Sequence, residues 1–301
     1  MTPANGRPFG WRGLCLLGGL VGSLAATAAP PPPGAAAPAE PVAERIAVSG
    51  RTFELVRSGH GSPTVVFESG LGASLTAWRR FLPALARTTS VVAYSRAGEG
   101  ASDPATAPRT PAAVAEDLRA LLLQAGFKPP YVLVGHSVGV LYIRAFALKY
   151  PQEVGGLVLI DGTPEGWIQG MKRIDPVHTA LQLRQLAASK AAGFPEQGNS
   201  GAREEWAGLY DILVSGSLGV PGALPDVPMI VITGMRPDGT DPRVLQMKRD
   251  LQGEVFRATT QGMHIVTARS GHGVPQDEPE LVERAITWTV DAARARTPPA
   301  P

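Results

Sequence analysis

Short apolar runs recur along most of the chain and predict a β-sheet. The first two flank Gly50-Arg51 and predict a hairpin. Most of the others are rich in Val, Ile and Leu and lack polar alternation, which is typical of strands covered on both faces. The eight runs are Arg45–Ser49, Thr52–Arg57, Thr64–Glu68, Ser90–Ser95, Tyr131–His136, Gly156–Asp161, Pro228–Thr233 and Met263–Ala268.

Helical periodicity fills several of the segments between these runs. Helices are predicted at Ala77–Arg87, Pro111–Ala125, Val138–Tyr150 and Glu280–Ala293. Because alternating strands and helices require crossover connections, we predict an α/β fold with a doubly wound, mostly parallel eight-stranded sheet and helices on both faces. Ligands of such sheets bind beyond the carboxyl ends of the strands, so residues at those ends are the first site candidates.

One connection is too long for a plain loop. Residues 162–226 contain no strand-like run, but helix-like stretches occur at Ile174–Ala192 and Arg203–Val214. Structureless connections of this length are uncommon in compact domains, so we predict a helical cap inserted after the sixth strand. The folded domain is predicted to span residues 45–296, with a disordered tail at 297–301.

The N-terminal segment has the pattern of an export signal. Arg7 and Arg12 precede an apolar run at 14–25, and small residues follow it. Together they predict a signal peptide over residues 1–29, with an uncleaved membrane anchor as the alternative. Residues 30–44 are rich in proline and alanine and predict a linker. We therefore expect an exported protein, either periplasmic or secreted.

Composition and charge narrow the range of partners. Hydrophobic residues make up 44% and charged residues 18% of the chain, as in ordinary globular proteins. The formal net charge is +2, and loss of Arg7 and Arg12 would leave basic and acidic residues balanced. We therefore expect a small-molecule partner rather than nucleic acid, and a membrane partner only if the signal stays uncleaved. The single cysteine, Cys15, lies in the predicted signal, which leaves no disulfide for the mature chain.

A serine stands at the junction of a predicted strand and a predicted helix. The sequence Gly135-His136-Ser137-Val138-Gly139 matches Gly-x-Ser-x-Gly. At a sharp strand-to-helix turn this pattern exposes a strained serine beside the positive end of the helix. Ser137 is therefore the candidate nucleophile, and an idle serine in a structural turn is the alternative. His136 should point away from Ser137 and is predicted to be a packing residue rather than the base.

Segments around this motif resemble the α/β-hydrolase superfamily. They include Phe67-Glu-Ser-Gly-Leu-Gly-Ala-Ser74 and Tyr94-Ser-Arg-Ala-Gly-Glu-Gly-Ala-Ser102, and the likeness spans residues 64–166 and resumes at Pro228. Ser95 stands where the family often has Asp, and Val140 stands where Gly is common. The resemblance implies a serine hydrolase, and esters are the substrate class that many branches of the family share.

A serine nucleophile requires a base, and the base requires an orienting acid. His272, within Ala268-Arg-Ser-Gly-His-Gly273 after the last strand, is similar to the family's histidine loop. Two strand ends offer an acid, Asp161 after the sixth strand and Asp238 after the seventh. Both fit the order Ser, Asp, His, so the choice stays open, with Asp161 narrowly preferred.

Two backbone amides are candidates for stabilising a tetrahedral oxyanion. These are Val138, which follows the nucleophile, and Leu71 in the glycine-rich segment after the third strand. In the predicted cap, Trp167 and Met171 are candidates for an apolar acyl pocket, although they fit the core of the cap equally well.

No metal or dinucleotide motif occurs in the sequence, so no cofactor is expected. The predicted activity is acyl-enzyme hydrolysis of carboxylic esters. An acyltransferase, an aminopeptidase or a perhydrolase with the same triad is the alternative. A secreted binding protein that keeps the fold without catalysis is the alternative of another class.

Overall fold

The computed structural model describes residues 41–106, 108–193 and 200–296. The signal peptide predicted at 1–29, most of the linker and the tail at 297–301 lie outside these ranges, so they stay predictions. Within the ranges, none of the helices combines the length and apolarity that a membrane span needs.

An eight-stranded sheet forms the centre of the described domain, in the order β1-β2-β4-β3-β5-β6-β7-β8. The strands are β1 (Glu44–Val48), β2 (Arg51–Ser58), β3 (Thr64–Glu68), β4 (Val91–Tyr94), β5 (Tyr131–His136), β6 (Val154–Ile160), β7 (Met229–Gly234) and β8 (Gly262–Thr267). The β1–β2 and β2–β4 pairs are antiparallel and the other pairs are parallel. The predicted mostly parallel sheet is therefore confirmed, as is the hairpin.

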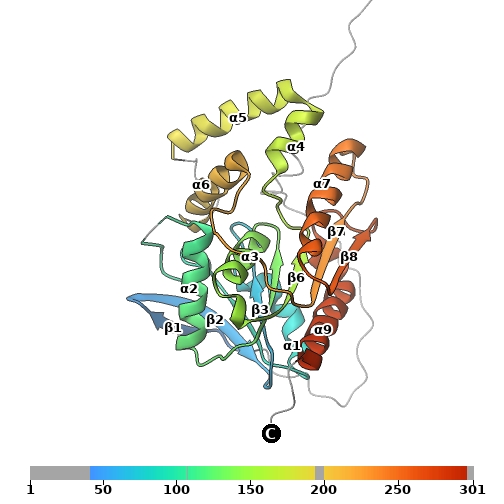
Figure 1. The fold of residues 1–301 in the computed structure, drawn as a ribbon. Coiled ribbons are helices and arrows are strands. Elements are labelled where there is room, and N and C mark those ends of the chain that lie inside the picture. The colour runs from blue at the N-terminus through green and yellow to red at the C-terminus, as the bar shows by residue number, and fades with distance from the viewer. Residues whose placement is uncertain (1–40, 107, 194–199, 297–301) are drawn as a thin grey trace, which may run out of the picture. The chain divides into compact units, whose positions relative to one another are not determined.

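Helices cover both faces of the sheet and create two cores (Figure 1). The helices α2 (Pro111–Gln124) and α3 (Gly139–Lys149) cover one face, where strand residues such as Leu133 are buried. The other face is covered by η1 (Leu75–Phe81), α1 (Leu82–Leu85) and α9 (Pro279–Arg296). Val132 and Val134, the neighbours of Leu133, belong to this second core. The alternation of side chains along β5 explains why the run is apolar throughout.

Three helices follow β6 and lie beyond the carboxyl edge of the sheet (Figure 1). They are α4 (Trp167–Ile174), α5 (Pro176–Ala191) and α6 (Ser200–Ser215), so the inserted helical segment is present. The helix-like stretch predicted from Ile174 to Ala192 corresponds to α5, whereas Ile174 itself ends α4 and Asp175 separates the two helices. The Asp175 side chain accepts from the His178 amide and caps α5, and Pro176 occupies the first position of that helix.

The apolar pattern did not predict α7 (Pro242–Val255), which connects β7 to β8. Its start has the expected signals, because the Asp241 side chain accepts from the Arg243 amide and proline is the first helical residue. The remaining short helices are η2 (Pro151–Glu153), η3 (Phe256–Ala258) and α8 (Val274–Asp277). The helix α7 proves important because it reaches the candidate site.

Candidate active site

Ser137 lies in a strained turn between β5 and α3. Its φ is 58°, a left-handed conformation that is uncommon for a non-glycine residue. Neighbouring glycines make room for the turn. A Cβ at Gly139 would lie 2.5 Å from the Glu68 carbonyl oxygen and 2.7 Å from that of Ser69, and one at Gly135 would lie 2.9 Å from the Gly139 carbonyl oxygen. The small residues of the motif therefore allow the nucleophile turn to approach the end of β3.

The structure brings Ser137, His272 and Asp161 together in one line of hydrogen bonds. His272 Nε2 lies 3.0 Å from Ser137 Oγ, and His272 Nδ1 lies 2.7 Å from Asp161 Oδ2. Because a carboxylate only accepts, Nδ1 carries the proton that it donates to Asp161, and Nε2 is left to accept from the serine hydroxyl. This is the arrangement in which imidazole can take a proton from serine.

The alternative acid, Asp238, is not brought to His272. It lies exposed in the loop after β7, where its carboxylate accepts from the amide of Thr240 at 3.2 Å and from its hydroxyl at 2.6 Å. These bonds stabilise a local turn. Of the two aspartates that the sequence left open, the structure places Asp161 beside the imidazole.

Helix α7 and strand β7 supply further partners of Asp161. Lys248 Nζ lies 3.0 Å from Asp161 Oδ1, and the Gly234 amide donates to the same oxygen at 3.0 Å. Gln252 anchors the turn after the acid by donating to the Gly162 carbonyl at 2.7 Å. Burial raises the pKa of Asp161, but the hydrogen bond to His272 and the charge of Lys248 outweigh it and lower that pKa to about 2. The carboxylate is therefore ionised at neutral pH.

The loop that carries His272 is fixed by close packing against β7. A Cβ at Gly234 would lie 1.8 Å from the Gly271 carbonyl oxygen, so only glycine permits this approach. The Arg236 amide donates to the Ser270 carbonyl at 2.9 Å, and Ser270 Oγ donates to buried Glu278 at 2.5 Å. These contacts hold the loop on both sides of the histidine.

His136 contacts His272 through a hydrogen bond and its ring. Its Nε2 donates to the His272 carbonyl at 2.8 Å, and the two rings lie 4.8 Å apart. Burial and, after it, the neighbouring His272 lower the pKa of His136 to about 4. His136 is therefore a neutral donor at neutral pH. The packing role predicted for it did not include this bond.

The segment Ser69–Gly72, here called the oxyanion loop, lies beside the nucleophile. A Cβ at Gly70 would be 3.5 Å from the Ser137 Cβ. Among the described residues, neither the Leu71 amide nor the Val138 amide donates to a protein acceptor. Val138 is the N-cap residue of α3, and helix geometry leaves the first amides at a helix start without an internal partner. Both predicted donors thus remain available to a ligand.

Comparison with known proteins agrees with the fold. Residues 63–199 match the protein family described as alpha/beta hydrolase fold. This part of the chain resembles that family, and the described domain has the α/β-hydrolase fold. The match, which the sequence resemblance implied, supports an enzyme and a hydrolase.

Individual relatives of this chain are distant. It is 25% identical over 231 residues to the uncharacterized protein YqjL of Bacillus subtilis, covering 76% of the chain and 84% of the relative. It is 35% identical over 120 residues to the putative carbamate hydrolase RutD of Caulobacter sp., covering 38% of the chain and 44% of RutD. The chain thus spans less than half the length of RutD.

Solved structures share the fold at low identity. A thermophilic esterase from Thermogutta terrifontis matches with a TM-score of 0.59 at 20% identity, covering 84% of this chain and 99% of the esterase. An epoxide hydrolase from Bacillus megaterium matches with a TM-score of 0.64 at 15% identity, covering 82% of this chain and all of the other, 100%. These proteins act on different bonds, so at these identities the likeness establishes the fold.

The structure explains both departures from the superfamily pattern. Ser95 Oγ donates to Glu54 Oε2 at 2.8 Å, so strand β2 supplies a carboxylate where the family often has Asp. Val140 lies against Gly162, where an added Cβ would be 2.7 Å from the valine Cγ1. The glycine after Asp161 therefore makes room for the larger residue after the nucleophile motif.

The two cap residues considered for substrate binding both lie on α4. Trp167 is buried and Met171 is partly exposed. The segment before α4 is tied to the nucleophile turn, because the Thr163 amide donates to the Ser137 carbonyl at 3.2 Å. This contact brings the base of the cap to the site, and the substrate-binding role of the two residues stays a prediction.

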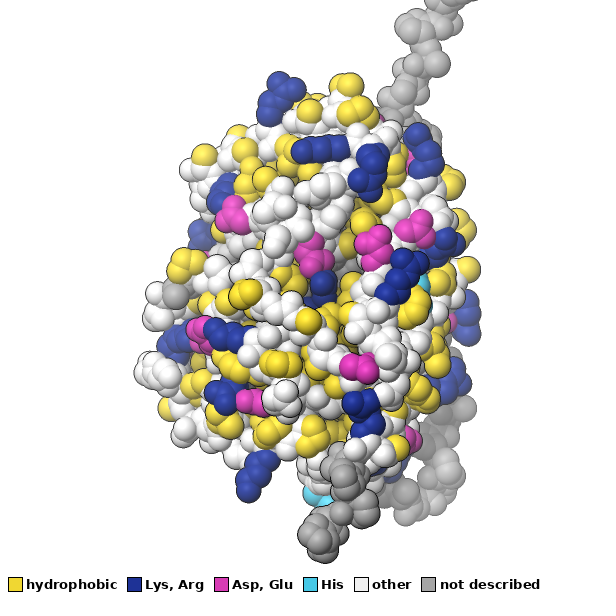
Figure 2. Space-filling view, in the orientation of Figure 1, with side chains coloured by type: hydrophobic (Ala, Val, Ile, Leu, Met, Phe, Trp, Pro, Cys, Tyr) yellow, Lys and Arg dark blue, Asp and Glu magenta, His cyan; other side chains and the backbone are white. Residues whose placement is uncertain are grey.

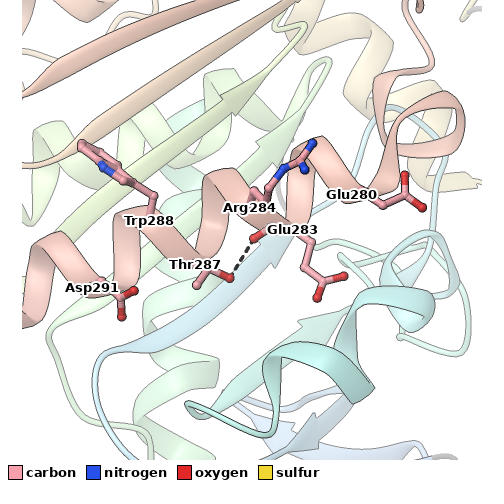
Figure 3. A pocket seen from close by; sticks show the side chains of 6 residues that line it. All are labelled: Glu280, Glu283, Arg284, Thr287, Trp288 and Asp291. Atoms are coloured by element: carbon pink, nitrogen blue, oxygen red, sulfur yellow. Dashed lines mark hydrogen bonds between the residues drawn. The ribbon is translucent and has the colours of Figure 1, made fainter.

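One surface hollow lies away from this site. A hollow along the outer side of α9 is lined by Glu280, Glu283, Arg284, Thr287, Trp288 and Asp291, and contains no member of the triad (Figure 3). Basic and acidic side chains are interspersed on the face shown in Figure 2. Among the described residues, no cluster of three His, Cys, Asp or Glu side chains is placed to hold a metal ion.

Proposed function

We propose that this hydrolase cleaves carboxylic esters through an acyl-enzyme on Ser137. The proposal is carried by the line of hydrogen bonds from Asp161 through His272 to Ser137, at 2.7 and 3.0 Å. A serine, a base within hydrogen-bond reach and an acid that orients the base are the parts that nucleophilic acyl transfer requires.

The reaction proceeds in two steps, acylation of Ser137 and hydrolysis of the acyl-enzyme. His272 Nε2 takes the hydroxyl proton while Ser137 Oγ bonds to the ester carbonyl carbon, and the amides of Leu71 and Val138 donate to the oxyanion. The C–O bond to the alcohol then breaks, and His272 returns the proton to the leaving oxygen. Water repeats the sequence on the acyl-enzyme and releases the acid. Throughout, ionised Asp161 stabilises the imidazolium.

Three alternative activities use the same triad and differ only in the nucleophile that attacks or in the group that leaves. An acyltransferase gives the acyl group to an acceptor other than water, an aminopeptidase cleaves an amide, and a perhydrolase uses peroxide. Esters are proposed because the alcohol oxygen of an ester leaves more readily than the nitrogen of an amide. Ester hydrolysis also needs no second substrate besides water, unlike acyl transfer or perhydrolysis. A binding protein without catalysis would have no use for a strained serine hydrogen-bonded to its base.

Pre-steady-state kinetics test the proposal. Purified protein mixed with p-nitrophenyl esters of increasing acyl length should release nitrophenol for at least one length, with Ser137→Ala as the inactive control. Where release of the acid is the slow step, an initial burst should approach one nitrophenol per chain. Added methanol should divert part of the product to methyl ester, because it competes with water for the acyl-enzyme.

The other outcomes separate the alternatives. Release from amide but not ester substrates would indicate a peptidase. Product formed only when an alcohol acceptor is present would indicate a transferase. Folded protein that releases no more nitrophenol than Ser137→Ala at any acyl length would overturn the esterase proposal.

A further inference from the structure

Arg96 lies between the oxyanion loop and the cap helix α6, and its side chain is only 1% exposed. Nη1 donates to Glu68 Oε1 and to the Ser69 carbonyl, each at 2.7 Å. Nη2 donates to the Gly70 carbonyl and to Glu205 Oε2, each at 2.7 Å, and Nε donates to Glu205 Oε1 at 2.5 Å. All five N–H groups of the guanidinium are therefore used.

Two of these hydrogen bonds determine the orientation of the peptide groups in the oxyanion loop. The Gly70 carbonyl and the Leu71 amide belong to one peptide group, and in a trans peptide the C=O and N–H bonds point in opposite directions. By holding the Gly70 carbonyl on one side, Arg96 directs the Leu71 N–H to the other. The bond to the Ser69 carbonyl orients the preceding peptide group in the same way. Arg96 thus controls the direction of a proposed oxyanion donor without touching the substrate.

Glu205 brings the cap into this arrangement. It lies on the same face of α6 as Gly201 and Gly208, four residues after one and three before the other. A Cβ at Gly201 would lie 3.0 Å from the Ala97 carbonyl oxygen, and one at Gly208 would lie 2.4 Å from that of Arg109. The helix therefore rests directly on the backbone that carries Arg96, and Glu205 is the carboxylate between the two points of contact.

The buried charges of Arg96, Glu68 and Glu205 contribute little net stability to the fold. Both carboxylates are fully buried, and Glu68 also accepts from the Tyr94 hydroxyl at 2.5 Å. The free energy lost when such charges leave water is about as large as the free energy gained from their attraction. Apolar residues of similar size would therefore stabilise the fold equally well. What an apolar replacement would lose is the fixed direction of the two loop carbonyls.

We propose that Arg96 is the positioning residue of the oxyanion loop and that Glu205 holds Arg96 in place, which makes cap helix α6 a fixed part of the active site. The proposal rests on the proposed acyl-transfer function, because only that chemistry requires a directed Leu71 amide.

A comparison of Glu205→Gln with Asp211→Asn tests the proposal. Asp211 is the control because it is also an acid of α6, but it pairs with Lys190 of α5 and does not reach the loop. The kcat/KM of each variant is measured on an ester and on its thionoester, whose sulfur accepts hydrogen bonds weakly. Loss of one oxyanion donor lowers kcat by about 10²–10³-fold in other serine hydrolases, so a donor that is only misdirected should cost the ester about tenfold or more.

The ratio of the two rates separates positioning from simple loss of folded protein. Glu205→Gln should lower the ester rate more than the thionoester rate, whereas unfolding lowers both equally. Arg96→Lys should behave similarly, because an ammonium has three donors for five acceptors. Asp211→Asn should keep the wild-type ratio. An unchanged ratio in both Glu205→Gln and Arg96→Lys would overturn the proposal.

Hydrogen exchange gives a readout that does not depend on activity. Amides of the peptide covering 69–75 should exchange faster in Glu205→Gln than in wild type or Asp211→Asn. Equal exchange in all three would show that Glu205 does not hold the loop. If wild-type protein hydrolyses neither substrate, the proposed function fails, and the exchange experiment still decides whether α6 holds the loop.

Discussion

Replacing Asp161 with Asn is expected to lower kcat by about four orders of magnitude while the protein stays folded. The Asp161 carboxylate accepts the Nδ1 proton of His272 at 2.7 Å, which leaves Nε2 free to accept from Ser137. An amide at this position can present its NH₂ group, which favours the tautomer with the proton on Nε2 and blocks the base. It also cannot stabilise the imidazolium. Steady-state kinetics, with folding checked by circular dichroism, measure the effect.

Asp238→Asn is the matched control for this substitution. It removes the same charge from the loop after the next strand along the chain, where the carboxylate accepts hydrogen bonds from Thr240. Its kcat should stay within a few-fold of wild type. If Asp238→Asn were inactive and Asp161→Asn active, the acid would be Asp238 and the hydrogen-bond line described above would have no catalytic meaning.

Replacing Gly234 with Ala is expected to lower activity and stability together. The added methyl would lie 1.8 Å from the Gly271 carbonyl oxygen, so the His272 loop or the end of β7 must move. Displacing a catalytic group by about 1 Å can cost 10²-fold in rate, and overpacking of this kind typically costs about 1–3 kcal/mol of stability. Enzyme kinetics and urea denaturation measure the two losses.

Gly271→Ala tests the steric explanation from the other side of the same contact. A Cβ at Gly271 would have its nearest neighbour at 3.9 Å, the Nη2 atom of Arg236, so it meets no obstacle. This variant should keep both its midpoint in urea and most of its activity. Equal damage from the two substitutions would mean that the loop, and not the contact with β7, is sensitive to any change.

The sheet was predictable because each strand is apolar over its whole length. Val132, Leu133 and Val134 are buried on opposite faces in turn, which is why the β5 run stands out without alternation. The nucleophile turn was predictable for a related reason. Its glycines, such as Gly139, are required by contacts as close as 2.5 Å and leave a local signature in the sequence.

The acid and its surroundings could not be predicted in the same way. Asp161 and Asp238 both follow strands, and what separates them is three-dimensional, namely which strand end faces the loop of His272. Lys248 and Gln252 were not predicted as part of the site because they lie on α7, a helix with a mostly polar sequence. Its capping aspartate and the apolar spacing of Val244 and Leu251 were the signals available.

The contacts of Arg96 could not be predicted from the sequence for another reason. Its partners Glu68 and Glu205 stand 28 and 109 residues away in the chain, and no local pattern connects them. A buried arginine leaves no trace in the hydrophobic pattern except a charged residue just after an apolar run. Only the approach of α6 to the sheet edge brings these charges together.

Covalent labelling with a fluorophosphonate tests the central claim most directly, because this probe reacts with a serine that a neighbouring base has activated. Intact-protein mass spectrometry should show one adduct per folded chain, peptide mapping should place it on Ser137, and Ser137→Ala and His272→Ala should remain unlabelled. A folded wild-type chain that takes up no probe, or that carries the adduct on another residue, would contradict the account.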